Sequence, residues 1–68
     1  MEVFQKRIKE LRIENGLTQK QLAEKLNITN STVCDWEKGR SEPDLTTLAK
    51  VAKFFTISAD YLVGLSDD

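Results

Sequence analysis

The 68-residue sequence contains no histidine, one cysteine and one proline. The single cysteine, Cys34, excludes a disulfide within one chain and fits a reducing compartment. Without histidine, the chain lacks the ligand set of the usual His/Cys zinc sites. No apolar run approaches the roughly 20 residues that span a bilayer, and no signal-like segment begins the chain. We therefore expect a soluble cytoplasmic protein that binds no metal or cofactor and does not contact a membrane.

Two further shortages argue against catalysis. The chain has three glycines and no glycine-rich phosphate loop, and its length leaves little volume for a substrate pocket. This length predicts one domain spanning residues 1–68, which hides only about 60% of its unfolded surface. The sequence therefore predicts a single domain that is not an enzyme.

Positive charge is scarce overall, with a net charge of −1, but it is unevenly distributed. Residues 1–53 hold ten Lys and Arg against eight Asp and Glu, whereas residues 54–68 hold three Asp and no cation. The local surface, rather than the net charge, determines whether a polyanion is attracted. We expect the short acidic tail at residues 66–68 to face away from any phosphate backbone.

Helical periodicity dominates the first half of the chain. Phe4, Ile8 and Leu11 recur at i, i+4 and i+7, which predicts a first helix that ends near Gly16. The segment Thr18–Gln21 has the T-x-x-Q form of a capping box, which predicts the start of a second helix. The apolar residues of that helix are Leu22, Ala23 and Leu26.

Polar caps also divide the second half of the chain into helices. Asp44 follows Pro43 and can cap a fourth helix, and Ser58 can cap a brief fifth helix that stops at Gly64. We expect the fourth helix to bury a stripe formed by Leu45, Leu48, Ala49 and Ala52. With the third helix described next, the prediction is five helices and no strand.

The connection between the second and third helices, at Asn27 and Ile28, is too short for antiparallel packing, which predicts a helix-turn-helix pair within residues 18–38. Thr29 can cap the third helix. Its inward residues, at i, i+3 and i+4, are then Val33, Trp36 and Glu37, and its outward residues are mostly small: Asn30, Ser31, Cys34, Asp35 and Lys38. Short side chains allow a helix backbone to approach base edges in the DNA major groove, whereas a merely solvated face more often carries Glu, Lys and Arg.

Several motifs together resemble the helix-turn-helix family of phage repressors and Cro-like (XRE-type) bacterial regulators. They are T-Q-x-x-L-A at residues 18–23, S-T-V-x-x-W-E-x-G at 31–39, Pro43, and L-x-x-L-A at 45–49. The resemblance extends over residues 8–65. It implies a compact, all-α, five-helix domain like that of lambda repressor, in which the third helix reads the major groove of DNA.

The resemblance also assigns roles to single residues. It implies that base edges meet Asn30, Ser31 and Asp35, and that phosphates or flanking backbone meet Gln19, Thr29, Lys38 and Arg40. Each has a plainer alternative, because the small polar residues can be caps and the cations can be ordinary surface charges. The resemblance further pairs Arg12 with Glu37 in a partly buried ion pair, whereas the alternative is two solvated charges.

The resemblance implies a sequence-specific transcriptional regulator, a repressor, that binds a near-palindromic operator of double-stranded DNA as a homodimer. We expect an apolar cluster near the C-terminus to form the dimer interface, with core packing as the alternative: Phe54, Phe55, Ile57, Tyr61 and Leu65. A second functional class stays open, in which the same fold is an antitoxin or another protein-interaction module that binds a toxin or an antirepressor.

Overall fold

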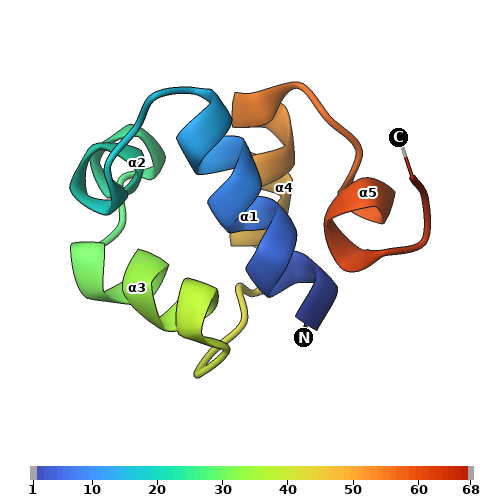
Figure 1. The fold of residues 1–68 in the computed structure, drawn as a ribbon, viewed down its shortest axis with the longest axis horizontal. Helices are drawn as coiled ribbons and strands as arrows, with labels where there is room; N and C mark the ends of the chain where they lie inside the picture. Colours follow the sequence, from blue (N-terminus) through green and yellow to red (C-terminus); the bar gives the residue numbers. More distant parts are fainter. Residues whose placement is uncertain (1, 68) are drawn as a thin grey trace.

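A computed structural model describes residues 2–67, which form five α-helices and no strand. The helices are α1 (Glu2–Glu14), α2 (Gln19–Leu26), α3 (Asn30–Lys38), α4 (Leu45–Phe55) and α5 (Ala59–Val63). Helices α2 and α3 lie on one side of α1, and α5 lies on the other (Figure 1). The all-α fold predicted from the sequence is confirmed.

The helix ends follow the predicted capping chemistry. The Thr18 hydroxyl accepts a hydrogen bond from the Gln21 backbone N–H, and the Gln21 side chain accepts one from the Thr18 N–H, which completes the capping box. At the starts of α3, α4 and α5, the side chains of Thr29, Asp44 and Ser58 each accept a hydrogen bond from the backbone N–H three residues further on. Local sequence therefore determines where these helices begin.

The core joins α1 to the other helices through large apolar side chains. Phe4 and Ile8 of α1 are buried, as predicted, and the Phe4 ring meets the edge of Trp36 with centroids 5.6 Å apart. This edge-to-face contact is a favourable aromatic geometry. The complete buried set comprises Phe4, Ile8, Leu11, Leu22, Ala23, Leu26, Val33, Trp36, Val51, Ala52 and Leu62.

The predicted apolar stripe of α4 is wrong at two positions. Leu45 is 85% exposed and Ala49 is also exposed, whereas Val51 is fully buried beside Ala52. The buried face instead follows Leu48, Val51, Ala52 and Phe55. Helix α4 carries apolar residues on more than one face, and burying Val51 and Phe55 hides more apolar surface than burying Leu45 and Ala49.

None of the helices within residues 2–67 has the length and hydropathy needed to span a bilayer.

Candidate nucleic-acid interface

The tight turn between α2 and α3 aligns the two helices as a steeply crossing pair. Asn27 ends α2 in the left-handed conformation, with φ 58° and ψ 45°, and the next N–H, that of Ile28, bonds to the Ala23 carbonyl at 2.9 Å. Asparagine tolerates this conformation better than most residues with a Cβ. Ala23 and Val33 are both buried, so the two helices pack closely and α3 turns its opposite face outward.

An ion pair and its hydrogen bonds connect α3 to α1 and to the start of α2. Arg12 Nε donates to Glu37 Oε2 at 2.7 Å, and Arg12 Nη2 donates to Glu37 Oε1 at 3.0 Å. The side chains are only 13% and 4% exposed, respectively. The hydrogen bonds with Glu37 raise the pKa of the Arg12 guanidinium above its ordinary value. The two residues that the resemblance pairs are thus in direct bidentate contact.

Gln19 and Leu17 extend this network. Gln19 Nε2 donates to Glu37 Oε1 at 3.2 Å, and Arg12 Nη1 donates to the Leu17 carbonyl at 2.9 Å. Gln19 is partly buried at the first turn of α2. The network therefore fixes the N-terminus of α2 against α3, which is the arrangement needed if Gln19 is to meet a phosphate while bracing α3.

The outer face of α3 is accessible at most of the predicted positions. Asn30 and Ser31 are exposed at the first turn, and Thr29 is exposed just before it. The Thr29 hydroxyl lies 2.7 Å from that of Thr32 and accepts the Thr32 N–H, so its capping role is observed directly. Cys34, predicted to face outward, is only partly exposed.

The far end of α3 brings two predicted site residues together. Asp35 Oδ1 lies 3.7 Å from Arg40 Nη1, and the Arg40 N–H bonds to the Asp35 carbonyl at 2.8 Å. This contact was not among the predictions made from the sequence. Its signal was Gly39, because a left-handed glycine after a helix turns the following residue back toward the last turn. Lys38 is exposed beside this pair.

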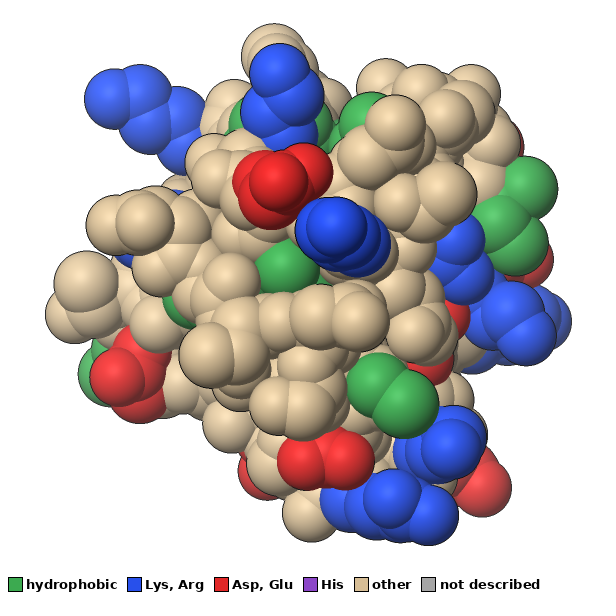
Figure 2. Space-filling view, turned by 90° about the vertical axis from the view of Figure 1, so that its left-hand side faces the viewer, with side chains coloured by type: hydrophobic (Ala, Val, Ile, Leu, Met, Phe, Trp, Pro, Cys, Tyr) green, Lys and Arg blue, Asp and Glu red, His purple; other side chains and the backbone are tan. Residues whose placement is uncertain are grey.

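The α2–α3 side of the molecule is mostly neutral. In Figure 2 this side faces the viewer, and uncharged side chains and backbone cover most of it, while Lys and Arg side chains lie mainly toward its edges. This distribution leaves short neutral groups where a helix would have to approach closely and places cations where phosphates would be met.

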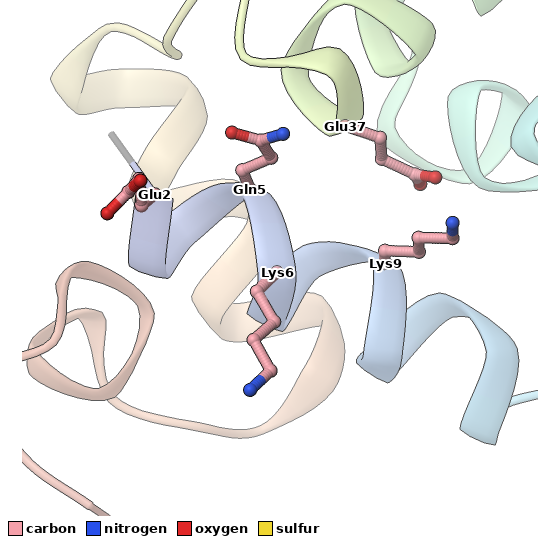
Figure 3. Close-up of a pocket in the computed structure, with 5 residues that line it drawn as sticks. All are labelled: Glu2, Gln5, Lys6, Lys9 and Glu37. Carbon is pink, nitrogen blue, oxygen red and sulfur yellow. The ribbon is translucent and has the colours of Figure 1, made fainter.

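A shallow hollow between α1 and α3, with a volume of about 340 Å³, is lined by Glu2, Gln5, Lys6, Lys9 and Glu37. Figure 3 shows Gln5 and Lys9 extending toward α3, whereas Lys6 points away from it. Because Glu37 is already paired with Arg12 and Lys6 points away (Figure 3), Lys9 and Glu2 are left to balance each other, so the hollow does not favour an anion. Gln5 also restricts position 39, because a Cβ on Gly39 would lie 2.6 Å from Gln5 Oε1.

The residues predicted to form the dimer interface differ in how deeply they are buried. Phe54 is 38% exposed and Leu65 is 79% exposed. The remaining three, Phe55, Ile57 and Tyr61, are partly buried against the core.

Arg7 of α1, which the sequence analysis did not select, anchors this C-terminal region. Its Nη1 donates to the Ser66 carbonyl at 2.7 Å and to the Tyr61 carbonyl, and its guanidinium lies 4.1 Å from the centre of the Tyr61 ring. No local pattern could have revealed this contact, because the partners are more than 50 positions apart in the sequence.

Comparison with known proteins agrees with this geometry. The sequence pattern of a family described as helix-turn-helix matches residues 8–62. The chain belongs to this helix-turn-helix family. It is 46% identical over 59 residues to the HTH-type transcriptional regulator ImmR of Bacillus subtilis (strain 168), a match that covers 87% of this chain and 46% of ImmR.

Two further proteins are similar to this chain. The immunity repressor protein of Bacillus phage phi105 is 47% identical over 58 residues, which cover 85% of this chain and 40% of that repressor. The crystal structure of a transcriptional regulator from Listeria innocua superimposes with a TM-score of 0.86 at 35% identity, covering 96% of this chain and 61% of that one. The chain thus spans less than half the length of these two curated relatives.

Proposed function

We propose that this helix-turn-helix chain is a sequence-specific regulator of transcription that binds double-stranded DNA with α3 in the major groove. The observation that carries the proposal is that hydrogen bonds fix the inner side of α3 while its outer side carries short side chains. Glu37, on the inner side of α3, is hydrogen-bonded to Arg12 of α1 and Gln19 of α2 and so holds α3 in place. Asn30 and Ser31 are exposed on the outer side of α3. A helix held in this way can enter a groove about 12 Å wide without bulky side chains in the way.

The residues divide into two roles. Asn30, Ser31 and Asp35 meet base edges, since amide, hydroxyl and carboxylate groups can each pair with hydrogen-bonding groups exposed in the major groove. Phosphates are met by residues at the ends of the two helices: Gln19, Thr29, Lys38 and Arg40. Arg12 and Glu37 act from below, by fixing the angle between α3 and the rest of the domain.

A net charge of −1 does not oppose this function. The N-termini of α2 and α3 supply unpaired backbone N–H groups and the positive ends of two helix dipoles, which attract phosphates without any formal charge. Fewer cations also lower non-specific affinity, which depends mainly on the number of phosphates neutralised. The design favours discrimination between sequences over general attraction to DNA.

The functional unit is a two-fold dimer on a near-palindromic operator, and the regulation is repression in the cytoplasm by occluding a promoter. One α3 contacts only a short half-site, and two of them, about 34 Å apart, give a longer and more selective site. Residues 1–68 act as one DNA-binding domain, with residues 66 and 67 of the acidic tail directed away from the duplex; the last residue of that predicted tail, Asp68, lies outside the described residues. The exposed apolar side chains of Phe54 and Leu65, with Phe55, Ile57 and Tyr61 behind them, supply the contact between subunits.

Selection of bound sites from random duplex DNA tests the proposal. The expected result is a recurrent site with two inverted halves whose centres are about one helical turn apart. Asn30→Ala serves as a paired variant, because it should lose the preference at particular base pairs while staying folded. Recovery of unrelated sequences with equal affinity would contradict the proposal, and recovery of single half-sites would contradict the dimer.

A further inference from the structure

The end of α3 forces a carboxylate and a guanidinium into contact at the surface assigned to DNA. Gly39 takes a left-handed conformation, with φ 76°, and the Arg40 N–H then bonds to the Asp35 carbonyl at 2.8 Å. This backbone bond returns Arg40 to the turn that carries Asp35, so that Arg40 Nη1 lies 3.7 Å from Asp35 Oδ1. The closeness of the two side chains is therefore encoded in the D-W-E-K-G-R segment at residues 35–40.

This pair is held loosely. The side chains of Asp35 and Arg40 are 41% and 66% exposed, respectively. Ion pairs with this exposure contribute little to stability in water, since the charges are well solvated whether or not they touch. Arg40 can therefore leave Asp35 for another anion at small cost, in contrast to Arg12, which is enclosed with Glu37.

Entry into a DNA groove changes the balance for both side chains. A carboxylate that approaches a duplex is repelled by the phosphates unless a donor satisfies it. The major groove offers two amine donors, that of cytosine and that of adenine, and a carboxylate pairs with the cytosine amine because the adenine amine stands beside the N7 acceptor, which repels it. A guanidinium near a phosphate gains a charge-assisted contact that is frequently bidentate. The Arg40 guanidinium thus has a better partner on DNA, a phosphate, than in the free protein. The Asp35 carboxylate has a better partner on DNA only when a cytosine stands opposite.

We propose that Asp35 and Arg40 form a partner-exchange pair, in which a cytosine amine takes over Asp35 and thereby releases Arg40 to bind a phosphate. When another base stands at that position, Asp35 retains Arg40 as its counterion, and the phosphate contact is lost together with the base contact. The contribution of Arg40 to affinity therefore depends on a base that Arg40 does not touch. This inference rests on the proposed DNA-binding function and adds a specificity role for Arg40 and its coupling to Asp35.

The test measures binding to two duplexes, the selected operator and the same operator with the base pair opposite Asp35 replaced. That base pair is found first, as the position at which Asp35→Asn loses its preference in site selection. Arg40→Gln should weaken binding to the operator about tenfold, the equivalent of one charge-assisted contact, and weaken binding to the replaced duplex far less. In the Asp35→Asn background, Arg40→Gln should weaken both duplexes to the same extent.

Lys38→Gln is the matched control, because Lys38 is an exposed cation on the last turn of the same helix. It should weaken both duplexes equally in either background. An equal loss from Arg40→Gln on both duplexes in the wild-type background would overturn the partner exchange while leaving the DNA-binding function intact. If the wild-type protein selects no site at all, the proposed function itself fails, and the partner exchange fails with it.

Discussion

The α2–α3 half of the molecule and the α4–α5 half are built in opposite ways. The first half is fixed by the Arg12–Glu37–Gln19 hydrogen bonds and presents short polar side chains to solvent. The second half leaves apolar side chains at the surface, with Leu45 85% and Leu65 79% exposed. The proposed function assigns the first surface to the polar edges of a DNA groove and the second to the contact between subunits.

The two halves also differ at their helix ends. Asn27 after α2 and Thr56 after α4 have nearly the same left-handed backbone, with φ 58° and φ 57°, respectively. Asparagine is comparatively comfortable there, whereas a β-branched threonine is strained. The turn after α2 is thus less strained than the turn after α4. Low strain suits a turn that has to hold α3 at a constant angle.

The largest expected effect comes from breaking the largely enclosed Arg12–Glu37 ion pair on the α2–α3 side. Glu37→Gln leaves the Arg12 guanidinium largely enclosed without a counter-charge, which should lower the free energy of unfolding by about 3–5 kcal/mol. Chemical denaturation measures the loss. Glu24→Gln, at an exposed position on α2, is the matched control and should change little. An equal denaturation midpoint for Glu37→Gln and wild type would show that the network does not hold α3.

A smaller effect is expected from the outer face of α3. Asn30→Ala should weaken binding to the selected operator by about 1–3 kcal/mol and remove the preference at particular base pairs, because one base contact is lost. Lys38→Ala should weaken all duplexes similarly and make binding less dependent on salt. Competition binding on operator and random duplexes separates the two. If Asn30→Ala weakened binding to every duplex alike, Asn30 would contact the DNA backbone rather than a base.

Exchanging the two left-handed residues tests the contrast in strain. Thr56→Asn should raise the free energy of unfolding by about 1 kcal/mol, and Asn27→Thr should lower it by about as much, since each exchange relieves or introduces the same backbone penalty. Thermal unfolding of both variants measures the two shifts. Shifts of the same sign would mean that side-chain contacts, rather than backbone conformation, determine these positions.

The smallest effect concerns the cap of α4. Hydrogen bonds from the Thr47 side chain and backbone hold the pKa of Asp44 below its ordinary value. The carboxylate therefore stabilises the folded state above the unfolded pKa, and this stabilisation is lost as the pH falls through the lower folded pKa. The difference in melting temperature between wild type and Asp44→Asn should shrink below about pH 4. A difference that stays constant with pH would show that the charge of Asp44 does not matter.

Much of the fold could be predicted because its signals are local. Thr18 and Thr29 determine where α2 and α3 begin through their side-chain caps, and Asn27 determines where α2 ends because it tolerates a left-handed backbone; these positions agree with the structure. The burial of Val33 and Trp36 follows from helical spacing alone.

The buried face of α4 could not be predicted in the same way, because α4 is apolar on several faces and only its neighbours select one. The contact of Arg7 with the end of α5 and the contact of Arg40 with Asp35 also depend on how the backbone folds back, which spacing within one helix does not describe. The candidate site was therefore predicted as a set of residues with one ion pair, Arg12–Glu37, while the contact between Asp35 and Arg40 was found only in the structure.

The most direct measurement of the central claim is an NMR titration of the protein with its selected duplex. If α3 enters the major groove, the amide resonances of Asn30, Ser31 and Asp35 shift most, together with those of Gln19 and Arg40 at the edges. Shifts confined to residues 54–65, with the α3 resonances unchanged, would contradict the account and assign nucleic-acid binding to the opposite half of the molecule.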